Sequence, residues 1–375
     1  MSEIGKKQIG AVILSAGRSS RQNGFKPALP IGPYTVLVHC LNLFSLAGLN
    51  HIAVVLGHRC SELLPSVRAA GALPVMNPDY EKGMFSSVQA GVAALPADVR
   101  AFFVLPVDIP LVRRVTIEVL CSGLAGDPNA DVLVPAFQGR TGHPPLIRDR
   151  LCEAIACHDG SRGLRGVLDK ASVSQVTVPD RHVLVDIDTP EQYEKAKALW
   201  QRQGIPNPEE AEVLLDWTAG RDRAVAAHSR AVARMADALA AAANQGGACR
   251  LDRGLVTAGA LLHDIAKKEP DHAAKGAGRL KAWGFADALA DIVACHADWE
   301  PGAGAPVSEI EIVYLADKLI QGDRPAPLDS RFEAKYHQFS GNRAARAGVY
   351  RRWRQARAIC RRVEAAMGRP VDEFL

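Results

Sequence analysis

Residues 11–26 read Ala-Val-Ile-Leu-Ser-Ala-Gly-Arg-Ser-Ser-Arg-Gln-Asn-Gly-Phe-Lys, and this stretch decides how the first half of the chain folds. Its first four residues form a short apolar run rich in β-branched side chains, which is typical of a buried parallel strand. In the segment that follows, small residues let backbone N–H groups approach an anion, and two arginines and a lysine balance the charge of a polyphosphate. An ordinary turn with solvated basic residues fits this stretch alone as well.

The length and composition of the chain indicate a two-domain globular protein. A chain of 375 residues is longer than one hydrophobic core usually serves. Hydrophobic residues make up 48% of the sequence and charged residues 23%, which is ordinary for a soluble protein. The net charge of +4 is small for this length, so we expect neither nucleic acid nor a membrane as a partner.

The cysteines and the apolar segments indicate the cellular compartment of the protein. The eight cysteines contain no Cys-x-x-Cys pair, which disfavours a thiolate metal site or a disulfide framework and fits a reducing cytoplasm. No segment reaches the roughly 20 consecutive apolar residues that span a bilayer. We therefore expect a cytoplasmic protein.

Up to about residue 200, short apolar runs alternate with longer helical stretches. This alternation predicts a three-layer α/β domain with a mostly parallel sheet. Ligands of such a domain bind beyond the carboxyl ends of the strands. The predicted strands cover residues 9–14, 51–56, 73–76, 101–106, 131–134 and 174–178, and the predicted helices cover 35–47, 60–70, 84–95, 115–123 and 190–203.

The character of the sequence changes near residues 203–210, which contain two prolines and a glycine. Beyond them strand signals largely vanish and alanine-rich sequence with high helix propensity takes over, for example at residues 224–243 and 286–297. The sequence thus predicts an α/β domain over residues 1–204, an all-α domain over 205–345 and a basic C-terminal helix over 346–375.

Two carboxylate-bearing segments suit the chemistry of a triphosphate. Asp108 follows the strand predicted at residues 101–106, where Mg²⁺ bound to a triphosphate needs a hard oxygen ligand. Asp188 lies in a second acidic segment just before a helix with Pro190 near its start, so by itself it is equally well explained as a helix N-cap. Residues 77–87 and 139–145, which lie between these segments, are rich in residues that build binding loops.

The order of these segments resembles the molybdenum-cofactor nucleotidylyltransferases of the MobA/MocA type. Their loop pattern L-[AG]-[AG]-G-x-S-x-R-M-G-x-x-K is similar to residues 14–26, and the resemblance continues through residues 77–87, 108–111, 142–144 and 186–190. One departure is Gln22-Asn23-Gly24, which replaces the usual Met-Gly-x and moves the glycine.

This resemblance implies a nucleotide-diphospho-sugar-transferase-like fold and Mg²⁺-dependent transfer of a nucleoside monophosphate from an NTP to a phosphate acceptor, with release of pyrophosphate. Arg21 and Lys26 would neutralise the triphosphate, while Asp108 and Asp188 would hold Mg²⁺. Ala16-Gly17 looks more like the members that use CTP, which favours molybdopterin as the acceptor. The implied nucleotide-binding residues are Leu14, Ser15, Ala16, Gly17, Lys26, Asn77, Ser86, Ser87 and Asp108.

The helical part of the sequence carries a second set of chemically active residues. Neutral imidazoles and carboxylates together are the ligands of Fe, Mn, Zn or Mg sites that hydrolyse phosphates, and two adjacent donors such as His263-Asp264 can bind one metal. A lone histidine on an alanine-rich helix is more often a core or surface residue than a metal ligand. The prediction of a metal site therefore rests on the whole set of residues. The candidates are His228, His263, Asp264, His272, His296 and Asp317.

Residues 260–267 and 314–318 resemble the H…HD…D motif of HD-domain metal-dependent phosphohydrolases, whose first histidine corresponds to His228. His272 and His296 look like the additional ligands of members that hold two metals. The resemblance implies hydrolysis of a nucleotide or phosphate ester by an active site with one or two divalent metals, in which Asp264 and Lys267 take part in catalysis.

The sequence therefore predicts a bifunctional enzyme, and two alternatives remain open. The first domain could transfer a nucleotide to a sugar or alcohol phosphate, because related α/β transferases share the loop, the lysine and the metal carboxylate. Alternatively, one domain could sense a nucleotide and regulate the other, or the protein could serve as a chaperone for a molybdenum hydroxylase apo-enzyme.

Overall fold

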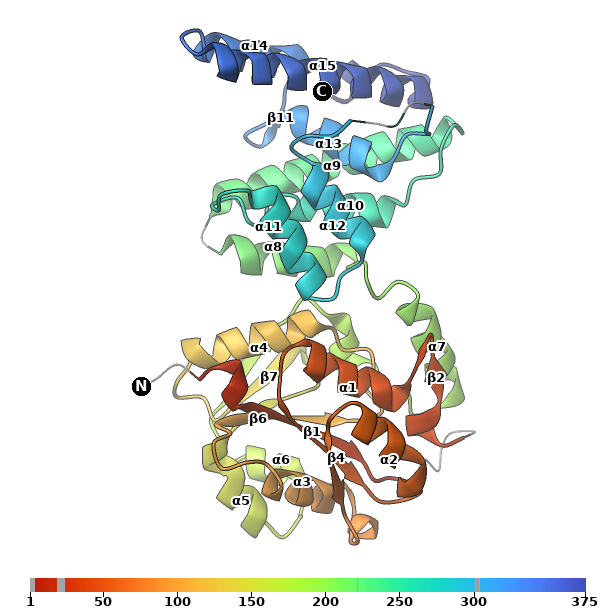
Figure 1. Ribbon diagram of the computed structural model, residues 1–375, viewed down its shortest axis with the longest axis vertical. Helices are drawn as coiled ribbons and strands as arrows, with labels where there is room; N and C mark the ends of the chain where they lie inside the picture. Colours follow the sequence, from red (N-terminus) through yellow and green to blue (C-terminus); the bar gives the residue numbers. More distant parts are fainter. Residues whose placement is uncertain (1–3, 19–23, 221, 301, 303) are drawn as a thin grey trace. The chain divides into compact units, whose positions relative to one another are not determined.

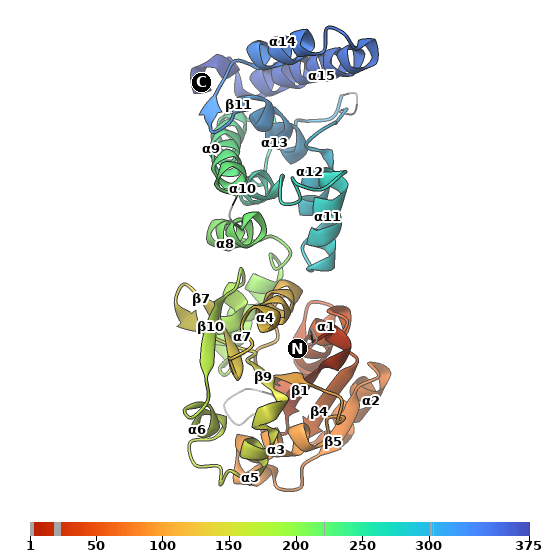
Figure 2. The same cartoon turned by 90° about the vertical axis from the view of Figure 1, so that its left-hand side faces the viewer.

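The computed structural model describes residues 4–18, 24–220, 222–300, 302 and 304–375. The chain folds into two compact units, Met1–Gln203 and Gly204–Leu375, which are described separately below. The first unit alternates strands and helices and the second is helical, as the ribbon in two orientations shows (Figures 1 and 2).

The first unit is built on a mixed, mostly parallel sheet. Among the described residues its strand order is β10-β7-β9-β6-β1-β4-β5, with β8 paired to β7. The strands are β1 Ile9–Ser15, β4 His51–Leu56, β5 Leu73–Met76, β6 Ala101–Pro106, β7 Val132–Phe137, β8 Arg140–Thr141, β9 Leu146–Arg148 and β10 Val173–Thr177.

The pairing confirms the predicted sheet, to which the structure adds two short strands, β8 and β9. Strand β1 runs parallel to both β4 and β6, so that Leu14 lies opposite Val55 and Pro106 at one edge. The three-residue strand β9 was not predicted, and it lies antiparallel between β6 and β7. The carboxyl ends of β1, β4 and β6 therefore meet at the same edge of the sheet, where ligands are expected.

Helices cover both faces of this sheet (Figure 1). On one face, α3 (Met84–Ala93), α5 (Cys152–Cys157) and α6 (Leu164–Leu168) share a buried apolar cluster with β1 and β4. On the other face, α1 (Val36–Leu46) packs against α4 (Arg114–Gly126). The remaining elements are the short hairpin of β2 Pro30–Ile31 and β3 Tyr34–Thr35 and the helices α2 Cys60–Ala69 and α7 Pro190–Trp200.

A buried carboxylate ties α4 to the segment that follows β10. Asp180 is fully buried and accepts hydrogen bonds from the Arg113 N–H (2.7 Å), the Thr116 hydroxyl (2.8 Å) and the His182 N–H (3.0 Å). Burial alone would raise the pKa of Asp180, but the contacts with His182 and Arg113 outweigh it and lower the pKa to about 2. The charged form is therefore the one that stabilises the fold.

Replacing Asp180 by alanine is expected to destabilise the protein by about 3–5 kcal/mol at neutral pH, because removing one partner leaves buried polar groups unpaired. The folded pKa lies below that of an unfolded aspartate, so this stabilisation is complete above about pH 4 and is lost as the pH falls towards 2. Thermal unfolding of both proteins at pH 7 and pH 3 should show the gap between them narrowing at the lower pH. An equal gap at both values would contradict this prediction.

The second unit is helical, as predicted, except for one short hairpin, β11 (Ile320–Gln321) and β12 (Arg324–Pro325). Helix α9 contacts α8, α10, α13 and α15. Helix α14 packs along α15, the arginine-rich helix near the end of the chain. The helices are α8 Pro208–Ala219, α9 Arg223–Gln245, α10 Arg253–Leu262, α11 His272–Ala282, α12 Asp287–Cys295, α13 Glu309–Lys318, α14 Leu328–Gln338 and α15 Arg343–Met367.

Close packing of α10 against α12 depends on a glycine. A Cβ atom at Gly259 would lie 2.6 Å from a methyl group of Ile292, a separation that side chains do not tolerate. This approach brings the C-terminal ends of α10 and α12, which carry His263 and His296, into one region. Within the described ranges, no helix has both the length and the apolar character that crossing a membrane requires.

Candidate functional site

The first candidate site is a pocket of about 300 Å³ at the carboxyl edge of the sheet. A hydrogen bond from the Val107 N–H to the Leu14 carbonyl (3.1 Å) joins the ends of β1 and β6 there. Gly83, with φ +108°, precedes α3 and lets the chain turn into the pocket wall. Of the residues predicted from the sequence, the pocket is lined by Leu14, Ser15, Ala16, Gly17, Lys26, Ser87 and Asp108.

Lys26, Asp108 and Asp188 meet at this edge, although 162 residues separate the first from the last. The Lys26 ammonium lies 2.7 Å from Asp188 Oδ1 and 3.4 Å from Asp108 Oδ2. A hydrogen bond from the Ile187 N–H to the Asp108 carbonyl (3.0 Å) holds the segment containing Asp188 beside the end of β6. Two partly buried carboxylates that converge on one positive charge are a donor set that fits a divalent cation.

The surroundings of Asp108 favour a bound cation. Burial is the main reason that the pKa of Asp108 is raised; the negative charge of Asp188 adds to this, and Lys26 opposes it. A cation at this position would relieve both effects. His143, which follows β8, is half-buried, and desolvation lowers its pKa while the charge of Asp108 opposes that shift.

The predicted binding residue Asn77 lies behind the pocket and organises the start of α3. Its side-chain amide donates to the hydroxyls of Ser86 (2.9 Å) and Ser87 (3.0 Å), and its oxygen accepts from the Asp79 N–H (2.9 Å). Ser87 lines the pocket, whereas the Ser86 hydroxyl contacts the carbonyls of Asp79 and Gly83. Asn77 therefore contacts the pocket-lining Ser87 but does not itself line the pocket.

The structure distinguishes the two explanations of Asp188. The N-cap of α7 is Thr189, whose hydroxyl accepts from the Gln192 N–H while the Gln192 side chain accepts from the Thr189 N–H. Asp188 is therefore not the cap, and it contacts Lys26. The predicted Arg21 lies outside the described residues.

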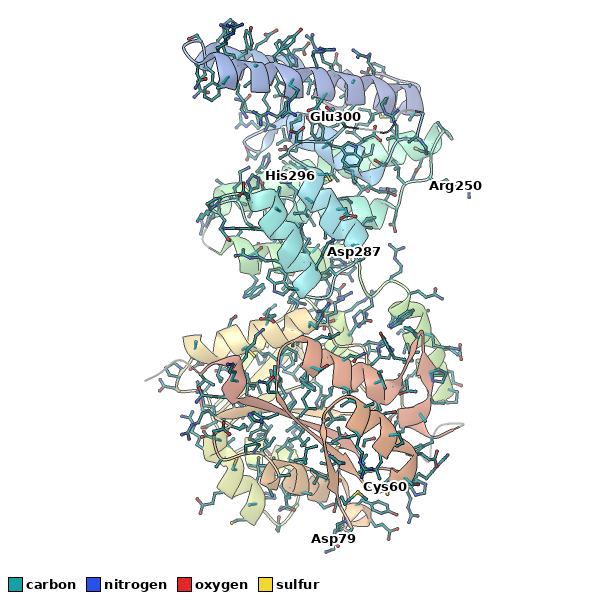
Figure 3. All side chains as sticks on the ribbon, viewed as in Figure 1. Cys60, Asp79, Arg250, Asp287, His296 and Glu300 are labelled. Atoms are coloured by element: carbon teal, nitrogen blue, oxygen red, sulfur yellow. The ribbon has the colours of Figure 1, made fainter. Side chains whose placement is uncertain are left out.

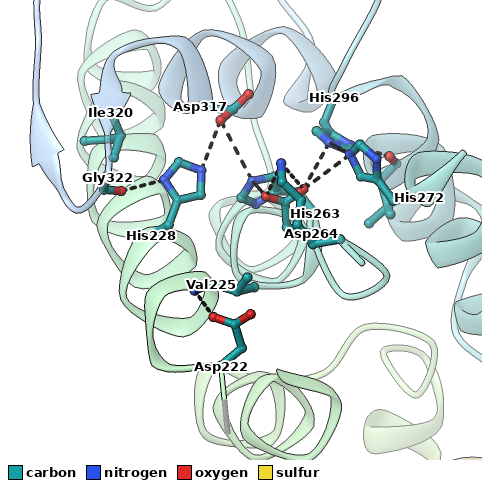
Figure 4. A network of polar contacts seen from close by, with 12 residues as sticks. Asp222, Val225, His228, His263, Asp264, His272, His296, Asp317, Ile320 and Gly322 are labelled. Carbon is teal, nitrogen blue, oxygen red and sulfur yellow. Dashed lines mark hydrogen bonds and ion pairs between the residues drawn. The ribbon is translucent and has the colours of Figure 1, made fainter. Parts of the chain in front are cut away.

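The second candidate site is a cluster of four histidines and two aspartates in the helical unit. Figure 4 shows these six side chains pointing toward one another, and Figure 3 shows that His296 and Asp287 mark opposite ends of α12. His228 lies on α9 and Asp317 on α13, while His263 and His296 are the C-caps of α10 and α12. His272 is the first residue of α11, and Asp264 follows His263.

The nitrogen and oxygen atoms of these side chains lie close to one another. His228 Nε2 is 3.2 Å from Asp317 Oδ1, and His263 Nε2 is 3.4 Å from Asp264 Oδ2. The Nε2 atoms of His272 and His296 lie 3.4 and 3.5 Å from Asp264 Oδ1. Asp264 thus belongs to two sets that could each hold a metal ion, one with His228 and His263 and the other with His272 and His296.

The hydrogen bonds of the histidine rings fit bound metal. In His228, His263 and His296, Nδ1 lies 2.7 Å from a backbone carbonyl, which only accepts hydrogen bonds, so Nδ1 carries the proton. In a neutral ring this leaves a lone pair on Nε2, and that atom faces carboxylate oxygen. Within the described part of the chain, the buried Nε2 of His263 has no hydrogen-bond partner. In metal-binding histidines one ring nitrogen usually donates to a carbonyl or carboxylate, which leaves the other nitrogen for the metal.

The pKa shifts of Asp264 and His263 also fit a bound metal ion. Burial alone would raise the pKa of Asp264, but contacts with His263 and His296 outweigh it and hold that pKa far below the usual range. Burial lowers the pKa of His263, yet Asp264 and Asp317 raise it more. The negative field that favours a proton on His263 equally favours a metal ion.

Basic residues surround this cluster, and the sequence indicated one of them. Lys267, the residue that the sequence indicated, contacts Asp264 (2.9 Å). The buried Lys318 donates to Asp317 Oδ2 (2.6 Å), and Arg331 donates to the Asp317 and Ile320 carbonyls. Lys318 and Arg331 were not predicted from the sequence. Lys318 could have been found because it directly follows the candidate ligand Asp317.

Comparison with known proteins finds a matching family model in each unit. Residues 11–177 match the family model described as "MobA-like NTP transferase domain", and residues 225–321 match the model described as "HD domain". The molybdenum cofactor cytidylyltransferase of Escherichia coli K12 is 28% identical over 191 residues, which cover 50% of this chain and 95% of that protein. The bifunctional protein GlmU of Corynebacterium aurimucosum is 31% identical over 148 residues, 37% of this chain and 30% of that protein.

Solved structures also resemble the first half of the chain. A nucleotidyl transferase from Methanothermobacter thermautotroptrophicus aligns over 52% of this chain and 98% of its own, with 22% identity and a TM-score of 0.45. A crystal structure of the Rv0371c protein of Mycobacterium tuberculosis covers 52% of this chain and all of its own, with 25% identity and a TM-score of 0.44.

Proposed function

We propose, from the premise that this chain joins a MobA-like NTP transferase domain to an HD domain, that it is a bifunctional cytoplasmic enzyme with two metal-dependent sites. The first transfers a nucleoside monophosphate from an NTP, with CTP favoured, to a phosphate acceptor, for which molybdopterin is the candidate. The second hydrolyses a nucleotide or phosphate ester. The convergence of Lys26, Asp108 and Asp188 supports the first activity, and the histidine–aspartate cluster supports the second.

In the transfer reaction an oxygen of the acceptor phosphate forms a bond to the α-phosphorus of the NTP. The bond from that phosphorus to the oxygen bridging the α- and β-phosphates breaks, and pyrophosphate leaves with the electron pair. Lys26, aided by Arg21, would balance the charge of the triphosphate, and the backbone of residues 14–17 would hold the nucleotide. Asp108 and Asp188 would hold Mg²⁺, which supplies charge stabilisation when bound.

In the second reaction water adds to a phosphorus atom and the ester or anhydride bond breaks. The six residues of the cluster would hold one or two ions of Fe, Mn, Zn or Mg, which activate water and polarise the phosphate when bound. Lys267, whose ammonium contacts Asp264, would face the negative charge of the phosphate. Carbonyl acceptors on Nδ1 of His228, His263 and His296 hold these rings in the required orientation.

The nucleotide and acceptor can be identified with one panel. We expect labelled CMP to be transferred from CTP to molybdopterin at least about tenfold faster than the corresponding transfer from GTP, ATP or UTP, a ratio that one or two well-placed polar contacts supply. The E. coli relative's name supports this choice. Faster transfer to a sugar 1-phosphate would instead support the alternative acceptor class, and no transfer with any pair would contradict the transferase half.

A further inference from the structure

A pocket of about 500 Å³ opens beside the histidine–aspartate cluster. Its wall includes the cluster members His228 and Asp264 together with Arg331 and Lys335 from α14. This volume is within the usual range for ligand sites, roughly 300–1,000 Å³. The pocket therefore has room for more of a substrate than the phosphate that the metal ligands would hold.

The pocket wall carries an excess of positive charge. Lys267, Arg331 and Lys335 line it, and the carboxylate in the same wall, Asp264, belongs to the proposed metal centre. Partial desolvation and then the neighbouring positive charges of Arg331 and Lys318 lower the pKa of Lys335. A cluster of cations at the mouth of a pocket is complementary to an anionic ligand.

Arg331 fixes the position of α14 relative to the cluster. Its guanidinium donates to the carbonyls of Asp317 and Ile320, and one of its nitrogens lies 3.7 Å from Asp317 Oδ1. Lys335 follows one helical turn later on α14, which places it on the same face as Arg331. Helix α14 also lies beyond residue 321, where the HD family match ends, so this wall is added to the HD domain by sequence outside the match.

We infer that Lys335, held beside the metal centre by α14 and Arg331, binds a second phosphate group of the substrate, so that the HD site acts on compounds with two adjacent phosphates. This inference rests on the proposed phosphohydrolase activity. In the reaction, water bonds to one phosphorus, the bond from that phosphorus to the bridging oxygen breaks, and the second phosphate leaves with the electron pair. Lys335 binds that leaving phosphate, whose negative charge increases as the bond breaks.

The experiment compares ADP with p-nitrophenyl phosphate, which has a single phosphate, as substrates of the full chain loaded with Mn²⁺. Lys335→Gln is expected to raise KM for ADP about tenfold and to leave kcat/KM for p-nitrophenyl phosphate and the bound metal unchanged, because a charged hydrogen bond to phosphate is lost. Lys335→Arg should restore most of the ADP affinity. Lys281→Gln, an exposed lysine on α11 outside the pocket lining, is the matched control.

A binding measurement separates this inference from the proposed activity. Both proteins compared carry Lys26→Ala, which weakens binding at the transferase site. In calorimetry, Lys335→Gln should bind methylenediphosphonate about tenfold more weakly than the protein that keeps Lys335. The two proteins should bind methylphosphonate equally. If the wild type hydrolyses no phosphate compound, the proposed hydrolase function fails and the diphosphonate binding still decides on the subsite. Equal effects on one-phosphate and two-phosphate compounds, or no effect on either, would overturn the inference.

Discussion

Replacing His263 by alanine is expected to abolish hydrolysis at the HD site and to lower the metal content of the protein. His263 is 1% exposed, and its Nε2 has no hydrogen-bond partner among the residues that the structure describes. The same atom lies 3.4 Å from Asp264 Oδ2 and 3.9 Å from Asp317 Oδ1. Residues that merely orient a metal ligand change affinity or activity by roughly 10–100-fold, so loss of a ligand should exceed about a hundredfold. Nucleotide transfer should be unchanged.

This prediction is measured by elemental analysis of the purified protein together with phosphate release. His337→Ala is the control, because His337 is an exposed histidine of the same unit that lies outside the cluster. Far-UV circular dichroism would confirm that both variants keep their helices. An unchanged metal content in the His263 variant would refute its assignment as a ligand.

Replacing Asp108 by asparagine is expected to reduce nucleotide transfer by roughly 10²–10³-fold, the usual effect of removing one group that stabilises transition-state charge. The amide keeps the shape of the side chain but not the charge that pairs with Lys26 and would bind Mg²⁺. Burial raises the pKa of Asp108, so the charged carboxylate is disfavoured in the folded protein. We therefore expect that the neutral asparagine does not lower the free energy of unfolding.

The matched control for this prediction is Asp98→Asn. Asp98 is exposed and precedes β6, whereas Asp108 follows the same strand. Initial rates of CMP transfer at saturating CTP should fall only in the Asp108 variant, and phosphate release by the HD site should be equal in both. A transfer rate in Asp108→Asn within a few-fold of wild type would refute the assigned role of this carboxylate.

Most of the α/β fold could be predicted because its central strands β1, β4 and β6 are buried and therefore form short apolar runs in the sequence. The apolar runs at residues 51–56, 73–76 and 101–106 coincide with β4, β5 and β6. Strand β9 is only three residues long, so its sequence is too short to show an alternation of apolar and polar residues. Its antiparallel place between β6 and β7 depends on pairing partners far away in sequence.

Residues of the candidate sites could be predicted from the sequence where they belong to a motif. Residues that reach a site only through the packing of another helix could not. The order of His228, His263-Asp264 and Asp317 indicated the metal cluster, and the structure brings these residues together. In contrast, no motif in residues 328–338 indicates a site, and it is the structure that places Lys335 in one pocket with His228 and Asp264. The role of Asp188 was open in sequence because an aspartate just before Pro190 can either cap a helix or bind a metal; in the structure the N-cap is Thr189.

The most direct test of two independent active sites is to measure both reactions side by side in wild type, Asp108→Asn and His263→Ala. CMP transfer from CTP to molybdopterin reports the first site, and phosphate release from ADP reports the second. We predict that Asp108→Asn loses only CMP transfer and that His263→Ala loses only phosphate release. Loss of both reactions in either variant, or retention of both in each, would contradict this account.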